Sequence, residues 1–327
     1  MRLLILGGTG FVGRAIVDDA MARGWEVTVF NRGTREPPAG ARALRGDRTT
    51  PTGLTALRTG AWDLAVDTWS GAPRVVRDAA ELLADRVARY VYVSSCSVYA
   101  FPSPVGAEED ADVVDGNPDA GDVAYANAKR GAELAVERAF GDRHLHVRAG
   151  LILGPWEDIG RLPWWLVRIA RGGPVLAPGP REAPLQYIDT RDLAAWVADA
   201  GAAGLTGAYN AVGPVGHTTM GELLDLCVRV TGSNAELRWT DPDALLAAGV
   251  EPWTELPVWL PAGAETDSMF RIGVERIRGA GLRVRPTAET VADTWTWLRE
   301  IGGTAPQRPD RPILGLAPKK EARLLRT

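Results

Sequence analysis

The sequence contains very little lysine. Of its 37 lysine and arginine residues only three are lysine, and two of these, Lys319 and Lys320, lie close to the C-terminus. Arginine supplies positive charge throughout the rest of the chain. The single internal lysine, Lys129, is therefore either an accident of composition or a position where a compact ammonium is required and a guanidinium is not tolerated.

Cysteine and histidine are also scarce. Two cysteines, Cys96 and Cys227, give no disulfide framework and predict a reducing, cytoplasmic environment. With only three histidines we predict no metal site, and His144 and His146 alternate along an apparent strand as packed or solvated residues. The apolar start MRLLILGG is interrupted by glycine too early for a signal peptide or a membrane span, so no membrane association is expected.

The overall charge argues against a nucleic-acid partner. The net charge is −4 and the pI is near 5.6, whereas nucleic-acid binding requires a basic face, so we expect no nucleic-acid partner. A chain of 327 residues with 46% hydrophobic and 24% charged residues suits one large soluble α/β domain or two intimate ones.

Short apolar runs alternate with segments of helical spacing along the first half of the chain. This alternation predicts a doubly wound parallel Rossmann sheet, with a smaller C-terminal substrate-binding region. We assign residues 1–150, with 185–212 returning to the sheet, to the dinucleotide-binding domain. The substrate-binding region comprises 151–184 and 213–300, and 301–327 form a Pro- and Arg-rich tail with a short helix. Predicted strands include 2–6, 25–30, 41–47, 63–69, 89–95 and 144–153, and a long helix is predicted over 122–140.

A glycine-rich loop joins the first predicted strand to the first helix. In LLILGGTGFVGRAIV, glycines at three-residue spacing permit a tight turn, the approach of a pyrophosphate and close helix–strand packing. The N-terminus of the following helix offers N–H groups and a positive dipole end to the phosphates. We predict that a dinucleotide contacts Gly7, Thr9, Gly10, Phe11, Val12 and Gly13.

The end of the second strand predicts which dinucleotide is preferred. Where NAD sites commonly place an acidic residue, this sequence has Asn31 followed by Arg32, which can pair with a 2′-phosphate. We therefore expect NADP(H) to be preferred, with NAD(H) as the alternative. Asp47 either accepts a hydrogen bond from the adenine amino group or caps a turn, and Thr68 is also expected to contact the cofactor.

Tyr125 and Lys129 lie four residues apart on the long predicted helix, and hence on one face. A neighbouring ammonium favours the phenolate form of a tyrosine, and it can also hydrogen-bond a nicotinamide ribose. Ser95 ends the fifth strand, at the carboxyl edge where open α/β sheets bind ligands. It is therefore placed to hydrogen-bond the substrate oxygen that Tyr125 protonates.

These motifs together resemble an extended short-chain dehydrogenase/reductase of the NAD-dependent epimerase/dehydratase family. GGTGFVG, SSCSVY, YANAK, RAGLILGP and LQYIDTRDLA follow the family's landmarks in order, over residues 1 to about 195. The resemblance implies Tyr125 as acid/base, Lys129 as its electrostatic partner, Ser95 as the carbonyl-orienting hydroxyl and a homodimer.

Departures from the family pattern narrow the reaction. Ser95, Cys96 and Ser97 replace the Thr-Asp-Glu of sugar-nucleotide dehydratases, so dehydration is not expected, and Cys96 is interpreted as buried and inert. Arg148 is followed by Ala149, Gly150 and Leu151 rather than by the R-x-x-N of sugar-nucleotide members, which argues against a nucleotide-sugar substrate.

The leading hypothesis is an NADPH-dependent oxidoreductase that reduces a ketone or aldehyde of a small molecule. The alternatives are an NAD(P)-dependent epimerase that transiently oxidises a sugar or sugar-like substrate, and a non-catalytic dinucleotide sensor or RNA-associated protein. Tryptophans in the C-terminal half offer large apolar contact area for a small molecule. Candidate substrate contacts are Ser97, Trp156, Trp164 and Gln186.

Overall fold

The computed structural model describes residues 1–326, which divide into two compact units. The first unit comprises Met1–Gly150, Thr190–Val212 and Ile272–Arg283, and the second comprises the segments between and after these. The sequence-based division differs in three places, because residues 185–189 and the tail residues 301–326 belong to the second unit and 272–283 return to the first. The roles of the two parts in binding cofactor and substrate stay predictions.

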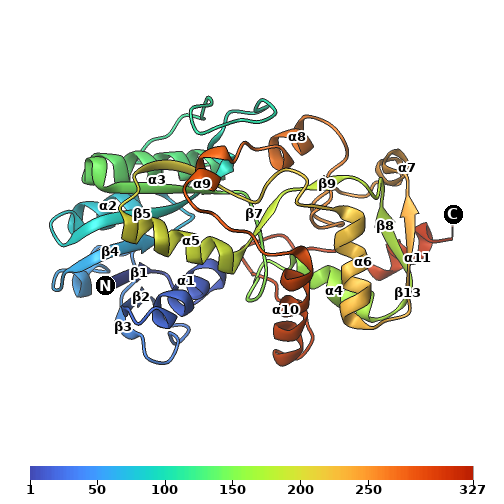
Figure 1. Ribbon diagram of the computed structural model, residues 1–327, viewed down its shortest axis with the longest axis horizontal. Helices are drawn as coiled ribbons and strands as arrows, with labels where there is room; N and C mark the ends of the chain where they lie inside the picture. Colours follow the sequence, from blue (N-terminus) through green and yellow to red (C-terminus); the bar gives the residue numbers. More distant parts are fainter. Residues whose placement is uncertain (327) are drawn as a thin grey trace. The chain divides into compact units, whose positions relative to one another are not determined.

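A parallel sheet forms the centre of the first unit, as the alternation of strands and helices predicts (Figure 1). In the described part of the chain it has seven strands in the order β11-β6-β5-β4-β1-β2-β3. The direction of winding reverses at β1, which pairs with both β2 and β4, and ligands of doubly wound sheets bind beyond the carboxyl ends at this point. The strands are β1 (Arg2–Leu6), β2 (Glu26–Asn31), β3 (Arg42–Arg45), β4 (Trp62–Asp67), β5 (Val87–Ser95), β6 (His144–Ala149) and β11 (Gly207–Ala211).

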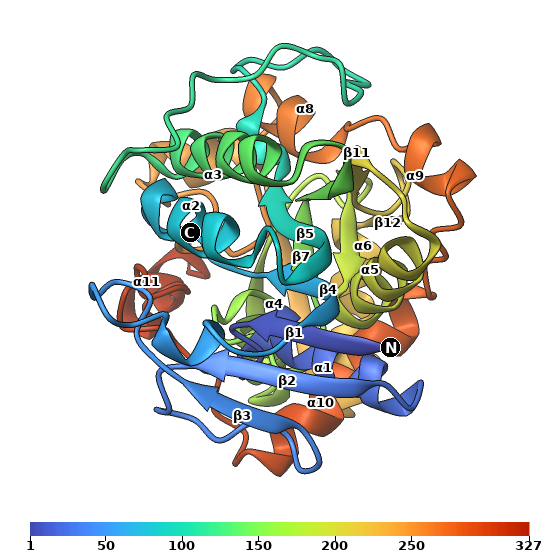
Figure 2. The same cartoon turned by 90° about the vertical axis from the view of Figure 1, so that its left-hand side faces the viewer.

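Helices cover both faces of this sheet. On one face α2 (Pro73–Leu83) and α3 (Tyr125–Phe140) lie side by side, and their apolar residues share a core with alternate residues of β1 (Figure 2). On the other, α1 (Phe11–Ala22) packs against α5 (Thr190–Ala203). Shorter elements are α9 (Glu275–Gly279) and the 3-10 helices η1 (Thr55–Leu57), η2 (Cys96–Val98) and η3 (Gly141–Arg143).

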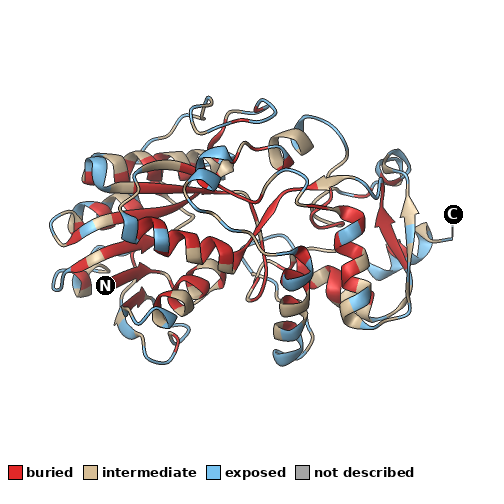
Figure 3. Cartoon of the chain, in the orientation of Figure 1, coloured by how far each residue is buried: buried red, intermediate tan, exposed pale blue. Residues whose placement is uncertain are grey.

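Burial explains why the inner strands read as continuous apolar runs. Leu3 to Leu6 are each at most 1% exposed, and the inner strands of the sheet are coloured as buried in Figure 3. A parallel strand with helices on both faces has no solvent side, so both alternating sets of side chains must be apolar. This is the feature that made β1, β2, β4 and β5 predictable from the sequence.

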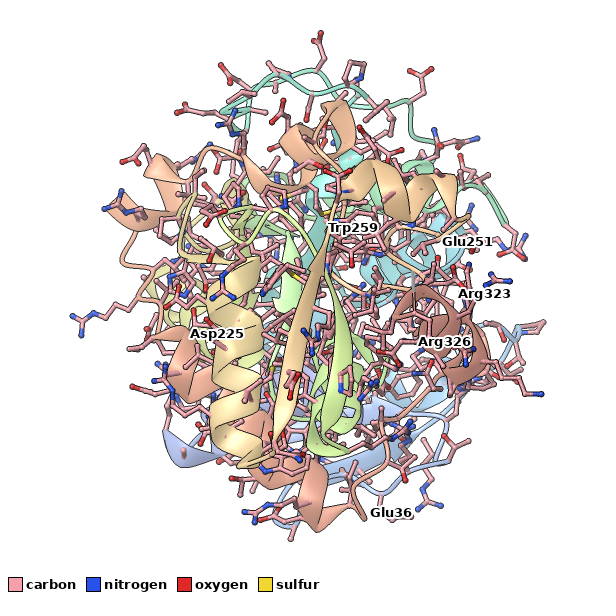
Figure 4. All side chains as sticks on the ribbon, turned by 90° about the vertical axis from the view of Figure 1, so that its right-hand side faces the viewer. Glu36, Asp225, Glu251, Trp259, Arg323 and Arg326 are labelled. Atoms are coloured by element: carbon pink, nitrogen blue, oxygen red, sulfur yellow. The ribbon has the colours of Figure 1, made fainter. Side chains whose placement is uncertain are left out.

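The second unit is built from short strand pairs and helices around its own apolar core. Trp165 and Trp259 are among its largest buried side chains. Asp225 lies on the exposed side of helix α6 (Met220–Thr231), as Figure 4 shows. The pairs are β7 (Leu151–Leu153) with β10 (Tyr187–Asp189), β9 (Pro184–Leu185) with β12 (Thr218–Thr219), and β8 (Gly173–Pro178) with β13 (Ala235–Thr240). The helices are α4 (Arg161–Ala170), α6 (Met220–Thr231), α7 (Pro242–Ala247), α8 (Ala264–Phe270), α10 (Thr287–Glu300) and α11 (Pro318–Leu324).

Several predicted strands differ from the observed ones by one or two residues at an end, and two predicted elements differ in a way that bears on the site. The expected strand 144–153 is two strands, β6 and β7, which separate at Gly150 and join different sheets. The expected helix 122–140 begins at Tyr125, because the backbone of Ala124 is extended, with φ −53° and ψ 145°. Among residues 1–326 no helix combines the length and apolarity needed to cross a membrane.

Candidate active site

The glycine loop after β1 is tightly enclosed. Gly7 has a φ of +124°, and a Cβ built there would lie 2.3 Å from the Thr68 hydroxyl oxygen. A Cβ on Gly13, in the first turn of α1, would lie 2.6 Å from the backbone nitrogen of Gly8. Only glycine allows the loop to approach the end of β4 and the helix to approach the loop so closely.

The N-terminus of α1 has the properties of a phosphate site. Gly10 is the N-cap residue, no side chain caps the helix, and its first turn contains no acidic residue. The first N–H groups of a helix lack intrahelical partners and carry a partial positive charge. The loop and the first turn, which include Thr9, Phe11 and Val12, therefore fit a dinucleotide pyrophosphate.

Asn31 and Arg32, which were predicted to select the dinucleotide, lie at the end of β2, and a further cofactor candidate, Asp47, follows β3. Asn31 ends β2, and its Oδ1 accepts a hydrogen bond from the Gly33 N–H at 2.8 Å. The exposed Arg32 follows directly. Asp47 caps a turn, because its Oδ1 accepts the Thr49 hydroxyl at 2.7 Å and the Thr49 N–H at 3.0 Å. These bonds, with the positive charge of Arg32, hold the pKa of Asp47 below its usual value.

The other cofactor candidate at this edge is Thr68, which follows β4. Its hydroxyl donates to the Leu6 carbonyl oxygen at 3.1 Å, across the point where the winding of the sheet reverses. Thr68 is thus a neighbour of the glycine loop, and its contact with a cofactor stays a prediction.

Lys129 is held by backbone carbonyls at the edge of the sheet. The residue is 3% exposed, and its Nζ donates to the carbonyl oxygens of Val93 at 2.7 Å and Trp69 at 2.8 Å. The same Nζ lies 4.7 Å from the ring centroid of Tyr92 and 5.9 Å from that of Tyr125. A planar guanidinium is too broad for this enclosure, so the geometry accounts for lysine at the position.

Tyr125 and Ser95 occupy neighbouring ends of two elements. Tyr125 is the first residue of α3 and is 41% exposed, whereas Ser95 is the last residue of β5 and is 8% exposed. The bond from Lys129 to Val93 fixes the first turn of α3 against the end of β5. Ser95 Oγ lies 3.0 Å from Ser97 Oγ and accepts the Ser97 N–H at 3.1 Å. The predicted hydroxyl, phenol and ammonium thus come from one edge of one unit.

The sequence analysis missed the residues that support Lys129. Asp67, at the end of β4, is fully buried and accepts two hydrogen bonds from Arg48, at 2.7 and 2.6 Å, and one from Tyr90 at 2.6 Å. It also accepts the Trp69 N–H at 2.9 Å, and Trp69 presents its carbonyl to Lys129. Burial opposes charge on Asp67, but Arg48 outweighs it and keeps the pKa of the carboxyl below its usual range.

Asp67 could have been noticed in the sequence, because it is a carboxylate that follows the apolar strand residues in the run DLAVDTW. The carbonyl groups of Val93 and Trp69 left no such signal, because every residue has one.

Arg148 is buried in the first unit, whereas Cys96 is only partly buried and not fully buried as the sequence analysis expected. The Cys96 thiol donates to the Arg148 carbonyl oxygen at 3.1 Å, and burial raises the thiol pKa to about 12. Arg148 is 5% exposed and binds both carboxylate oxygens of Glu133, at 3.0 and 3.1 Å. It also donates to the Tyr99 hydroxyl at 3.2 Å. These contacts give Arg148 a structural role and support the interpretation of Cys96 as inert.

The remaining substrate candidates belong to the second unit. Trp156 has a φ of +65°, and Trp164 packs against Trp165 with ring centroids 4.7 Å apart. Gln186 is fully buried, and its Nε2 donates to the Gly213 carbonyl oxygen at 2.9 Å. Contact of Trp156, Trp164, Gln186 or, in the first unit, Ser97 with a substrate stays a prediction.

Known structures share this fold over nearly the whole chain. The epimerase Mth375 from Methanothermobacter thermautotrophicus is 17% identical and has a TM-score of 0.67, with 91% of this chain and 92% of that chain covered. The Bordetella bronchiseptica enzyme WbmG, solved with NAD, is 17% identical with a TM-score of 0.66, covering 93% and 96%. UDP-glucose 4-epimerase from Thermus thermophilus, also with NAD, is 22% identical with a TM-score of 0.62, covering 91% and 99%.

At these identities the structural matches establish the fold, and no curated protein sequence is significantly similar to the chain. The family is established by the sequence. The sequence model of the NAD dependent epimerase/dehydratase family matches residues 3–66 and 59–211, well over half of the 327 residues. The matched segment contains the glycine loop, Ser95, Tyr125 and Lys129. The chain therefore belongs to the NAD dependent epimerase/dehydratase family of short-chain dehydrogenase-type enzymes.

Proposed function

We propose that this enzyme is an NAD(P)-dependent epimerase that inverts one carbon of a sugar or sugar-like substrate by transient oxidation. The observation that carries the proposal is the Lys129 ammonium, which is held by two carbonyls with the Tyr125 ring 5.9 Å away, in a chain of this family. The family match and the epimerases of similar fold favour epimerisation over the net reduction that the sequence analysis placed first.

The residues act on one substrate oxygen. Tyr125, as the phenolate, accepts the proton of a substrate hydroxyl, and Ser95 hydrogen-bonds the same oxygen to orient it. The fixed charge of Lys129 stabilises the phenolate before it accepts the proton and after it returns the proton. A bound nicotinamide supplies the acceptor and donor of hydride at the adjacent carbon. Tyr125 then returns the proton when that carbon is reduced from its other face.

Two observations bear on the class of substrate. The structural neighbours include a UDP-glucose 4-epimerase, and a WbmG structure contains UDP as well as NAD. In this chain Arg148 hydrogen-bonds Glu133. It is followed by Ala149, Gly150 and Leu151, so the R-x-x-N pattern of sugar-nucleotide members is absent. We therefore propose a hydroxyl-bearing sugar or sugar-like ring, and the assay for interconversion of epimers compares free sugars with nucleotide sugars.

A second candidate, reduction of a ketone or aldehyde with NADPH, is favoured by one specific observation. β2 ends in Asn31 and is followed by the exposed Arg32, so no carboxylate at this strand end opposes a 2′-phosphate. The structures of WbmG and of the Thermus thermophilus epimerase contain NAD, so a preference for NADP(H) is our own inference.

Cofactor retention and exchange separate the two candidates. The purified protein is denatured, any released nucleotide is identified, and the apo protein is titrated with NADH and NADPH. Retained NAD, together with interconversion of two epimers and no net change in coenzyme, supports the epimerase. Empty protein that prefers NADPH and consumes it in proportion to product supports the reductase. Failure to bind either dinucleotide contradicts both.

A further inference from the structure

Two of the three histidines meet a carboxylate at the amino end of β6. His144 and His146 lie on the same face of this strand, because they are two residues apart, and Glu137 is in the last turn of α3. In the sheet register His144 lies beside Tyr90 and Ala149 lies beside Ser95. The two histidines are therefore about three and five residues, roughly 10 and 17 Å, along the strand from the level of Ser95.

The three side chains are spaced for a shared cation. His146 Nε2 lies 3.3 Å from Glu137 Oε1, the two imidazole centroids are 4.5 Å apart, and one ligand atom from each residue lies within 4.8 Å of the others. Tetrahedral zinc with bonds of about 2.0–2.1 Å places its ligand atoms roughly 3.4 Å apart. The His146–Glu137 pair already has this spacing, and His144 requires a small side-chain rotation.

Both histidines offer a ring nitrogen to the cluster. His146 is 1% exposed, and within residues 1–326 neither of its ring nitrogens makes a hydrogen bond of acceptable geometry. The Nδ1 of His144 contacts the Gly141 carbonyl oxygen, which can only accept, so Nδ1 is the donor there and Nε2 is the ring nitrogen that can bind a metal. A metal-bound histidine commonly has such a carbonyl partner.

Glu137 is partly open to solvent. Its side chain is 36% exposed, which leaves room for a water as fourth ligand. Arg130 lies 3.1 Å from Glu137, but it also lies 2.9 Å from Glu133. Arg130 therefore keeps an anionic partner when Glu137 turns to a cation.

We propose that Glu137, His144 and His146 bind a divalent transition-metal ion of the zinc class, with water completing the coordination. Imidazole and carboxylate ligands suit Zn²⁺ better than they suit Mg²⁺. The ion joins the end of α3 to the start of β6, away from the carboxyl edge of the sheet, and stabilises this junction. The prediction of no metal site relied on the small number of histidines, but the fold gathers two of them.

The test uses untagged, chelator-treated full-length protein and Zn²⁺ alone, with Mg²⁺ as the hard-cation comparison. Isothermal titration should show one Zn²⁺ per chain, Zn²⁺ should raise the melting temperature, and Co²⁺ should give the visible absorption of a tetrahedral site. His144→Ala and Glu137→Gln should each weaken Zn²⁺ affinity at least about tenfold.

His217→Ala is the matched control, because it removes the third histidine, in the other unit, and leaves the cluster intact. It should bind Zn²⁺ like the wild type. Melting temperatures in chelator show whether the ligand variants fold. The proposal is overturned if the wild type does not bind Zn²⁺, if folded His144→Ala and Glu137→Gln bind it unchanged, or if only His217→Ala loses binding.

Discussion

At the scale of single residues, the scarcity of lysine has a structural explanation. Lys129 is enclosed by two carbonyl oxygens and the Tyr92 ring, with the exposed Tyr125 at the other end of the same helical turn. The enclosure fixes the ammonium, and the exposure leaves the phenol accessible. These opposite environments favour one residue as the fixed charge and the other as the group that exchanges a proton.

Replacing Tyr125 by Phe is expected to lower kcat by about 10²–10⁴-fold, because the proposed acid/base group is removed while the ring remains. Dinucleotide affinity should stay within about threefold of wild type, since the glycine loop is unchanged. Steady-state turnover and a dinucleotide titration measure the two effects. Near-normal turnover would show that Tyr125 is not the acid/base residue.

Lys129→Arg is expected to reduce turnover by at least about 100-fold although the charge is kept, because the guanidinium does not fit between the Val93 and Trp69 carbonyls. Lys320→Arg, in the C-terminal helix, is the matched control and should leave turnover unchanged. Equal activity of both variants would mean that Lys129 supplies only charge. Melting temperatures identify any loss of turnover that comes from misfolding.

At the scale of elements, contacts between strand ends and helix starts build the site. The loop after β1 closes against α1 at Gly13 and against Thr68 after β4. Asp67 links β4 to Arg48 and, through Trp69, to Lys129 on α3. Each contact joins residues from separate segments, so changes here should disturb both stability and the site.

Gly13→Ala is expected to destabilise the protein by about 1–3 kcal/mol and to weaken dinucleotide binding, because the new Cβ would press on the Gly8 backbone. Gly279→Ala is the control, since it lies in α9 with nothing within 4 Å of the added carbon. It should be neutral or slightly stabilising. Urea unfolding and a dinucleotide titration compare the two variants.

Asp67→Asn is expected to cost about 3–5 kcal/mol of stability, because Arg48 is left buried without its counter-charge. Asp63→Asn, at the solvent end of the same strand, removes an exposed pair with Arg2 and should cost at most about 1 kcal/mol. Chemical denaturation measures both. Equal losses would contradict the importance assigned to the buried pair.

At the scale of the whole molecule, a buried carboxyl makes stability depend on pH. Glu157 is fully buried in the second unit and accepts the N–H groups of Arg161 and Leu162 at the start of α4, at 2.7 and 3.2 Å. Burial raises its pKa from 4.5 to about 7, although the nearby Arg161 and the two N–H groups oppose the shift. The folded chain therefore holds this proton over a range where the unfolded chain releases it.

The stabilising contribution of Glu157 should be fully present below about pH 4.5 and lost as the pH rises through about 7. The loss amounts to about 3 kcal/mol. Glu157→Gln keeps an acceptor for the N–H groups and should remove this dependence. Urea unfolding of both proteins from about pH 5 to about pH 8 measures the difference. Parallel curves would show that Glu157 does not titrate over this range.

The sequence by itself determined the parallel sheet, the glycine loop and the Tyr125–Lys129 pair. Inner strands are enclosed on both faces and become apolar runs, and a helical spacing of four residues places Tyr125 and Lys129 on one face. These features depend on neighbours along the chain, so a local pattern records them.

Tertiary structure alone decided what supports and surrounds those residues. Arg48 and Asp67 are 19 residues apart, Trp69 and Lys129 are 60 apart, and the carbonyls that hold Lys129 leave no trace in residue identity. The split of 144–153 at Gly150 and the meeting of His144 and His146 with Glu137 likewise depend on pairing between distant segments. Such contacts arise when the chain closes on itself, because burial and hydrogen bonding then select partners that sequence spacing does not specify.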